Sequence, residues 1–158
     1  MSPPKNPSKD SPKVRIVLGP WSELAPLARP VRTQVFVLEQ NVPQELEWDD
    51  MDAVSLHALA LASATAGPDG AVATGRLLPD GHVGRMAVVP GWRGWGVGGA
   101  ILEALLQAAR ERAMSEAVLH AQVRAQAFYA RHGFVAEGPR FMEAGIEHVR
   151  MRLGLRLG

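Results

Sequence analysis

The segment RGWGVGGA, residues 93–100, constrains the fold more than any other part of the chain. An apolar run, VGRMAVVP, precedes it, and a run with apolar residues at helical spacing follows it. Its glycines let backbone N–H groups approach a phosphate closely, and the start of a helix adds partial positive charge. We therefore predict a strand, an anion-binding loop and a helix in succession. A tight turn without a ligand is the alternative, and it would need fewer glycines.

The loop satisfies two phosphate-binding patterns at once. Three of its glycines fit G-x-G-x-x-G, while Arg93 and two glycines fit R-x-x-G-x-G. The first pattern, the dinucleotide fingerprint, needs a strand that ends directly at the first glycine and a carboxylate at the end of the next strand. Residues 90–93 intervene here, and the next strand ends at Gln122 and Arg124. A Walker loop is excluded because no G-K-[ST] follows, so R-x-x-G-x-G remains.

The N-terminal third of the chain is predicted to contain one strand and two helices. Residues 14–18 are a β-branched run that predicts a strand. Residues 21–40 have a helical pattern with Ser22 as the N-cap. Pro30 has no backbone donor for the helix, so we expect a break or kink there, and two short helices rather than one. Residues 41–55 lack a period and are expected to form a carboxylate-rich loop.

Turn signals in the central part predict an antiparallel meander. The apolar runs 57–64 and 71–79 flank AGPDG, and a second PDG precedes the strand expected over 81–90. A helix over 97–113, a strand over 116–123 and a short helix over 124–132 follow, with Gly133 as the C-cap. Closing strands are expected over 134–155.

Composition limits the classes of partner. The chain has 158 residues and a formal net charge of only +1, so no basic field indicates nucleic acid. The absence of cysteine excludes disulfides, thiolate metal sites and a cysteine nucleophile. No apolar run reaches the roughly 20 residues of a membrane span, and residues 1–13 lack the apolar segment of a signal peptide. We expect a flexible tail over 1–13, a single domain over 14–158, no metal, no membrane or nucleic-acid partner, and a cytoplasmic location.

Residues 83–135 resemble the GNAT superfamily of acetyl-CoA-dependent N-acetyltransferases. The matching pieces are VGRMAVVP, RGWGVGGAIL and AQVRAQAFYARHGF. A wider set, RTQVFVLEQNVPQELEWDDMD, HAQ, FYARHGF and EAGIEH, is similar to the ElaA-type branch. The resemblance implies an α/β (α+β) fold with a mixed, mostly antiparallel central sheet and helices on both faces. It also implies acetyl-CoA as the cosubstrate.

The resemblance further implies a cofactor site. Backbone groups of Met86, Ala87 and Val88 would pair with the pantetheine arm, and Gln122 stands where many relatives have asparagine. Trp92 and Trp95 either cover the adenine or pack against the protein. The complete set predicted to contact the cofactor is Met86, Ala87, Val88, Arg93, Gly94, Trp95, Gly96, Val97, Gly98, Gly99, Gln122 and Tyr129.

Acetyl transfer to an amine needs a proton acceptor for the amine and a proton donor for the departing thiolate. Tyr129, the single tyrosine, occupies the family position of the general acid; its alternative role is packing beside Phe128 and Phe134. Glu47 and His120 are the foremost candidates for the base. Further candidates are Glu39, Glu45, Asp49, Asp50, Asp52, His57, Glu143 and His148. The loop carboxylates either orient a cationic amine or form a solvated surface, the histidines are alternatively structural, and a bridging water is a further possibility.

The main functional hypothesis is an N-acetyltransferase that moves the acetyl group directly to a primary amine of a small molecule or peptide, as a monomer or homodimer. Direct attack agrees with the absence of a cysteine to carry the acetyl group. Two alternatives stay open: an enzyme like the acyl-homoserine-lactone synthases, and a CoA-binding module without turnover.

Overall fold

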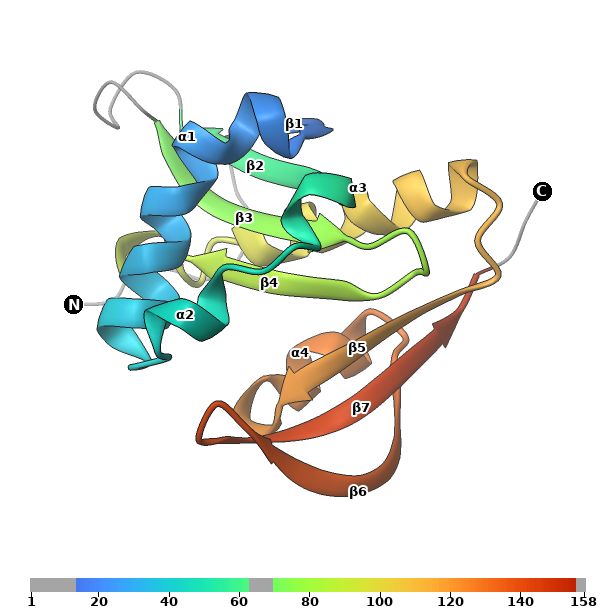
Figure 1. Cartoon of the computed structure of the whole chain (residues 1–158). Helices are drawn as coiled ribbons and strands as arrows, with labels where there is room; N and C mark the ends of the chain where they lie inside the picture. Colours follow the sequence, from blue (N-terminus) through green and yellow to red (C-terminus); the bar gives the residue numbers. More distant parts are fainter. Residues whose placement is uncertain (1–13, 63–69, 156–158) are drawn as a thin grey trace.

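The computed structural model describes residues 14–62 and 70–155. The first half of the chain forms an antiparallel sheet (Figure 1). Its strands are β1 (Val14–Pro20), β2 (Leu56–Ala62), β3 (Ala71–Leu77) and β4 (Val83–Val88), in the order β1-β2-β3-β4. The predicted hairpin and the third strand of the meander are therefore confirmed. The tail expected over 1–13 lies outside the described residues.

The second half forms a separate antiparallel sheet. Strands β5 (Glu116–Gln122), β6 (Val135–Glu143) and β7 (Ile146–Gly154) lie in the order β5-β7-β6. A parallel bridge between His82 and Val118 joins the two sheets, with the Val118 N–H donating to the Gly81 carbonyl at 3.1 Å. From this point β4 and β5 diverge (Figure 1). The mixed, mostly antiparallel architecture is confirmed, and its strands divide into two sheets rather than one.

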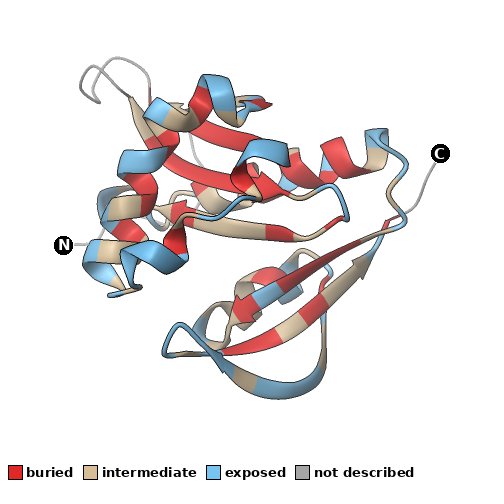
Figure 2. Ribbon diagram, viewed as in Figure 1, coloured by how far each residue is buried: buried red, intermediate tan, exposed pale blue. Residues whose placement is uncertain are grey.

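Helices cover both faces of the first sheet. Helix α3 (Val97–Glu111) packs on one face and α1 (Trp21–Arg32) on the other (Figure 1). Side chains of β2 alternate between the two faces of the sheet. Ala58 and Ala60 therefore belong to the core beneath α3, while Leu59 belongs to the cluster beneath α1. Both faces of β2 and β3 are buried as a result (Figure 2).

Gly75 in β3 allows α3 to lie close to the sheet. A Cβ atom at this position would lie 2.6 Å from Met86 Sδ and 2.9 Å from Ile101 Cγ2. Ile101, Leu102, Leu105 and Leu106 of α3 are almost completely buried. Each such side chain stabilises the fold by about 1.5–3 kcal/mol, so this contact anchors the helix and the glycine loop before it.

No break interrupts the helix at Pro30, so the expectation of two short helices divided there was wrong. Helix α1 runs through Pro26 and Pro30 and continues directly into a π-helix, η1 (Thr33–Glu39). Ala28, Val31 and Val35 are buried along this segment, so packing against the sheet outweighs the hydrogen bond that proline removes. Ser22 is not the N-cap either. Strand β1 ends at Pro20, whose extended backbone leads straight into Trp21 as the first helical residue.

Short helices complete the described chain. The expected loop over 41–55 contains α2 (Gln44–Glu47) and the 3-10 turn η2 (Asp52–Val54), and two further 3-10 turns are η3 (Pro90–Trp92) and η4 (Val123–Ala125). Helix α4 (Gln126–Arg131) has His132 as its C-cap, one residue before the predicted Gly133, which follows in the left-handed region at φ +97°. Within residues 14–62 and 70–155, no helix is long and apolar enough to cross a membrane.

Candidate active site

A cleft of about 1330 Å³ lies where the two sheets diverge. Its walls come from β4, the start of α3, β5, α4, η1 and α2. The edge of β4 that faces β5 has no strand partner beyond His82 in the described part of the chain. The splay therefore leaves backbone groups of Met86, Ala87 and Val88 beside an open cavity.

The glycine loop forms one end of this cleft. Gly94 and Gly96 have φ values of +86° and +81°, in the left-handed region that favours glycine. No heavy atom lies within 4 Å of a Cβ built on Gly96, so the loop has an open side. Gly96 is also the N-cap of the 15-residue helix α3 and provides no side-chain cap. The first N–H groups of this helix therefore form an anion-binding end that fits a pyrophosphate.

Eleven of the twelve predicted cofactor residues line the cleft, and Trp95 does not. Trp92 and Trp95 are both partly buried and pack against the main hydrophobic core, and Trp92 also lines the cleft. The Arg93 guanidinium is held by the protein, because Nε donates to the Val88 carbonyl and the other nitrogens donate to Glu39. Its side chain therefore supports the loop rather than pointing free into the cavity.

Gln122 occupies the end of β5 with its amide already bonded. Its Nε2 donates to Gln40 Oε1 at 2.8 Å, and its Oε1 accepts from Arg124 Nε at 3.0 Å. Gln40 directly follows η1, and its side chain contacts Gln122 at the end of β5. Its neighbour Glu39 binds Arg93 of the glycine loop, so the end of η1 contacts both β5 and the loop. Glu39 was a candidate base from the sequence, which gave no sign of this bridging role. The hydrogen bond from Arg93 lowers the pKa of Glu39, which makes it a poorer proton acceptor.

Tyr129 lies on α4 with its ring in the core and faces the cleft. The residue is 9% exposed and packs edge-on against Phe128 and Phe134. Burial raises the pKa of its phenol to about 12, so the hydroxyl keeps its proton near neutral pH. Among the described residues, no group bonds this hydroxyl, which leaves its proton for a ligand.

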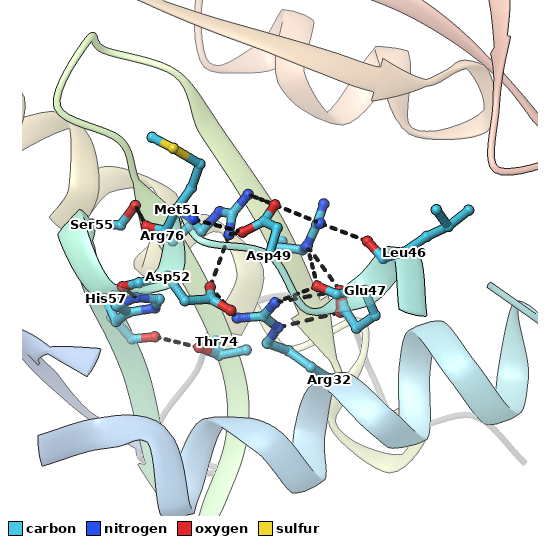
Figure 3. Close-up of polar contacts among 12 residues, drawn as sticks. Arg32, Leu46, Glu47, Asp49, Met51, Asp52, Ser55, His57, Thr74 and Arg76 are labelled. Carbon is cyan, nitrogen blue, oxygen red and sulfur yellow. Dashed lines mark hydrogen bonds and ion pairs between the residues drawn. The ribbon is translucent and has the colours of Figure 1, made fainter. Parts of the chain in front are cut away.

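Three arginines and three carboxylates form a connected network beside the cleft (Figure 3). Buried Arg32 donates to Glu47 and Asp52, with the closest pair at 2.7 Å. Arg76 binds Asp49 and Asp52, both at 2.8 Å. Arg85 Nε lies 2.8 Å from Glu47 Oε1. The formal charges cancel, and the network ties α2 and η2 to α1, β3 and β4.

This network changes the interpretation of the carboxylate-rich loop. Glu47 and Asp52 are buried rather than solvated, and Asp49, whose pKa the Arg76 hydrogen bond lowers to about 2, is ion-paired. Burial raises the pKa of Glu47, against the opposing effect of Arg32 and Arg85. Glu47 lines the cleft, yet both of its oxygens contact guanidinium groups. Glu45 and Asp50 are exposed, and neither lines the cleft.

The candidate histidines separate into two environments. His57 is buried outside the cleft lining, with Nε2 2.9 Å from the Asp52 carbonyl, and burial lowers its pKa. His120 lines the cleft, and its Nδ1 lies 3.1 Å from Glu143 Oε1. Glu143 and His148 line the same cavity. Within the described ranges, no group of three or more histidine and carboxylate side chains is arranged to hold a metal ion.

Comparisons with known proteins agree with this geometry. A family model described as an acetyltransferase (GNAT) domain matches residues 26–155. The chain is 38% identical over 125 residues to YjcF of Bacillus subtilis, an uncharacterized N-acetyltransferase, which covers 77% of this chain and 86% of that protein.

Solved structures show the same similarity. An acyl-CoA N-acyltransferase from Pseudomonas aeruginosa is 32% identical, with a TM-score of 0.76 over 89% of this chain and 99% of that chain. ElaA from Escherichia coli is 26% identical, with a TM-score of 0.77 over the same shares of the two chains. The ElaA-type resemblance is thereby confirmed.

Proposed function

Because this chain belongs to the GNAT acetyltransferase family, we propose that it transfers the acetyl group of acetyl-CoA directly to a primary amine. Family membership makes it an acyltransferase that uses an acyl-CoA. The acetyl donor, the amine acceptor and the residue roles below are our proposal. One observation carries it: the glycine loop, the open edge of β4 and the Tyr129 side chain line a single cleft.

The cofactor would lie along the divergence of the two sheets. Free N–H groups at the start of α3 would bind the pyrophosphate, since the loop is open at Gly96. Backbone groups of Met86, Ala87 and Val88 would pair with the pantetheine amides. Gln122 retains one N–H and one acceptor lone pair beyond its bonds to Gln40 and Arg124, which suffices for one further bond to the cofactor.

Tyr129 would be the general acid. A phenol with a pKa of about 12 stays protonated at neutral pH, and this hydroxyl has no competing partner among the described residues. The departing thiolate is a stronger base than a neutral thioester sulfur, so the hydrogen bond from Tyr129 strengthens as the C–S bond breaks.

His120 would be the general base. It lines the cleft with one ring nitrogen bonded to Glu143, and an imidazole accepts a proton on the other nitrogen. Glu47 was an equal candidate from the sequence. Its ion pairs with Arg32 and Arg85 favour a role in holding α2 in place.

The proton balance closes with these two residues. His120 takes a proton from the ammonium form of the acceptor, and the free amine attacks the thioester carbonyl carbon. The C–N bond forms, the C–S bond breaks, and Tyr129 protonates the thiolate. The amide nitrogen then returns its extra proton to the Tyr129 oxygen, while His120 releases its proton to solvent. The net products are the acetamide, free CoA and one proton.

The alternative of an enzyme like the acyl-homoserine-lactone synthases is not favoured. Two of the relatives above 30% identity are described as an N-acetyltransferase and an N-acyltransferase. A small-molecule or peptide amine therefore stays the proposed acceptor.

Thiol release from acetyl-CoA in the presence of a panel of primary amines tests the function. We expect release above the amine-free background for at least one amine, with a product heavier by one acetyl group. Longer acyl-CoA donors in parallel reactions test the preference for acetyl. Tight acetyl-CoA binding without release across small-molecule and peptide amines would instead identify a binding module.

A further inference from the structure

A tight hairpin places Glu143 between two histidines. Glu143 ends β6 and pairs with Ile146 of β7, and the turn residues Ala144 and Gly145 have φ values of +52° and +78°. Glu143 Oε1 lies 3.1 Å from His120 Nδ1, and Glu143 Oε2 lies 3.9 Å from His148 Nε2. The three side chains come from β6, β5 and β7, so the turn brings them together at the wall of the cleft.

The contact with Glu143 specifies the tautomer of His120. An ionised carboxylate only accepts hydrogen bonds, so the nitrogen that it contacts must carry the hydrogen. Nδ1 of His120 therefore donates to Glu143, and the neutral ring has its lone pair on Nε2. No group among the described residues bonds Nε2, and the side chain is 38% exposed within the cleft lining. This lone pair is available to an acceptor amine.

The second histidine does not compete for the same oxygen. His148 Nδ1 lies 2.7 Å from the Ile146 carbonyl, which accepts only, so Nδ1 is the donor there. Its Nε2 is too far from Glu143 for a direct hydrogen bond. Phe141 contacts both rings, edge-on to His120 at 5.1 Å and stacked on His148 at 5.9 Å. The aromatic contacts restrict both rings, and Glu143 Oε1 stays committed to His120.

We infer that Glu143 is a positioning residue that presents the Nε2 lone pair of His120 to the acceptor amine. The inference rests on the proposed function, because it assigns the atom through which the proposed base acts. Glu143 does not contact the acceptor in this assignment. It fixes the tautomer and the ring orientation, as a carboxylate does for a histidine that must offer one particular nitrogen.

Nitrogen NMR of the imidazole rings tests the tautomer without any activity measurement. In the wild-type protein at a pH where the ring is neutral, His120 should be in the Nδ1–H form, with its signals assigned by their absence in His120→Ala. Glu143→Ala should convert His120 to a mixture of tautomers. Glu143→Gln, whose amide oxygen still accepts from Nδ1, should retain the Nδ1–H form. Glu147→Ala removes an exposed carboxylate from the same hairpin and should change nothing.

Kinetics supply the second readout. Glu143→Ala should lower kcat by about 10- to 100-fold, by analogy with the range for groups that orient a metal-bound histidine, while the affinity for acetyl-CoA stays unchanged. In a His120→Ala background it should cause no further loss. An Nε2–H form in the wild type, or an unchanged tautomer in Glu143→Ala, refutes the inference. The inference is also refuted if Glu143→Ala lowers kcat by the same factor in the His120→Ala protein as in the wild type.

The two tests separate the inference from the proposed function. If no amine is acetylated but the tautomer responds to Glu143→Ala, the positioning contact is supported and the acetyl-transfer proposal fails. If acetyl transfer proceeds and Glu143→Ala changes neither kcat nor the tautomer, the proposed function survives and the inference is wrong.

Discussion

Arg93 joins the glycine loop to Glu39, which lies 54 residues earlier in the chain. Its Nη1 and Nη2 atoms donate to the two Glu39 oxygens at 2.7 and 2.6 Å, and its Nε donates to the Val88 carbonyl at 2.8 Å. The pair lowers the pKa of Glu39 and raises that of Arg93. Because both side chains are more than a third exposed, we assign the pair to fixing the loop rather than to stabilising the fold.

The first prediction follows from this pairing. Arg93→Ala and Glu39→Ala should each weaken acetyl-CoA binding about 3- to 10-fold, because either change frees the loop that binds the pyrophosphate. The double variant should lose less than the product of the two, since residues in one ion pair couple by about 0.5–3 kcal/mol. Calorimetric titration at a fixed salt concentration measures all four proteins.

Arg140→Ala is the matched control for this cycle. Among the described residues, the Arg140 side chain makes one ion-pair contact, at 3.7 Å from Glu147, and it does not line the cleft. Tighter binding by Glu39→Ala would contradict the prediction, because it would mean that Glu39 competes with the cofactor for Arg93.

The second prediction concerns Gly96. Its φ of +81° disfavours any β-branched residue, and the space beside it is open on the side where a phosphate would approach. Gly96→Val should therefore reduce acetyl-CoA affinity by at least about 10-fold and also destabilise the fold by about 1–3 kcal/mol through backbone strain. Affinity is measured on protein shown to be folded by circular dichroism. Wild-type affinity in a folded Gly96→Val protein would remove this loop from the cofactor site.

The third prediction concerns the buried charge network. Arg32 is fully buried, with its guanidinium against the rings of Trp21 and Trp48, and it donates to two buried carboxylates. Arg32→Ala should destabilise the fold by about 3–5 kcal/mol, because Glu47 and Asp52 would be left buried without their main partner. Urea unfolding measures the change. Arg140→Ala, which breaks an exposed ion pair, should lower the free energy of unfolding by less than about 1 kcal/mol. Similar losses for the two variants would contradict the prediction that burial makes Arg32 the more costly residue to remove.

The strand–loop–helix unit was predictable because its signals are local. The glycines of residues 94–99, the apolar spacing of α3 and the turn signals of the hairpins each specify a short segment without reference to the rest of the chain. The continuous α1–η1 helix was not predictable in this way. Local chemistry at Pro30 indicates a break, and the packing of Val31 and Val35 on the sheet overrides it.

The charge network was missed for a related reason. The sequence shows carboxylates in residues 45–52 but does not show which cations meet them after folding. A signal was present nonetheless, because Arg76 and Arg85 each interrupt an apolar strand. A buried arginine requires a carboxylate partner, and the acidic loop was the nearest source. Ion pairs were therefore the better expectation than an amine-binding surface for Glu47, Asp49 and Asp52.

The fourth prediction concerns Tyr129, which the proposed mechanism requires as the proton donor. Tyr129→Phe keeps the ring that packs against Phe128 and Phe134. Because the described residues do not bond the hydroxyl, its removal should change the free energy of unfolding by less than about 1 kcal/mol. Acetyl-CoA affinity should also be retained. Turnover should fall by about 10²- to 10⁴-fold, the range for one positioned acid, measured as single-turnover acetyl transfer with a saturating amine.

The pH dependence of stability gives an independent check on the environment of Tyr129. Burial raises its pKa from 10.0 to about 12, so the folded protein holds this proton at a pH where the unfolded chain has released it. Its contribution is fully present below pH 10 and is lost as the pH rises toward 12. Because Tyr129 is the single tyrosine in the chain, tyrosinate absorbance reports it directly. The midpoint should lie near 12 in the native protein and near 10 in urea. A native midpoint near 10 would mean that the phenol is solvated rather than buried in the core.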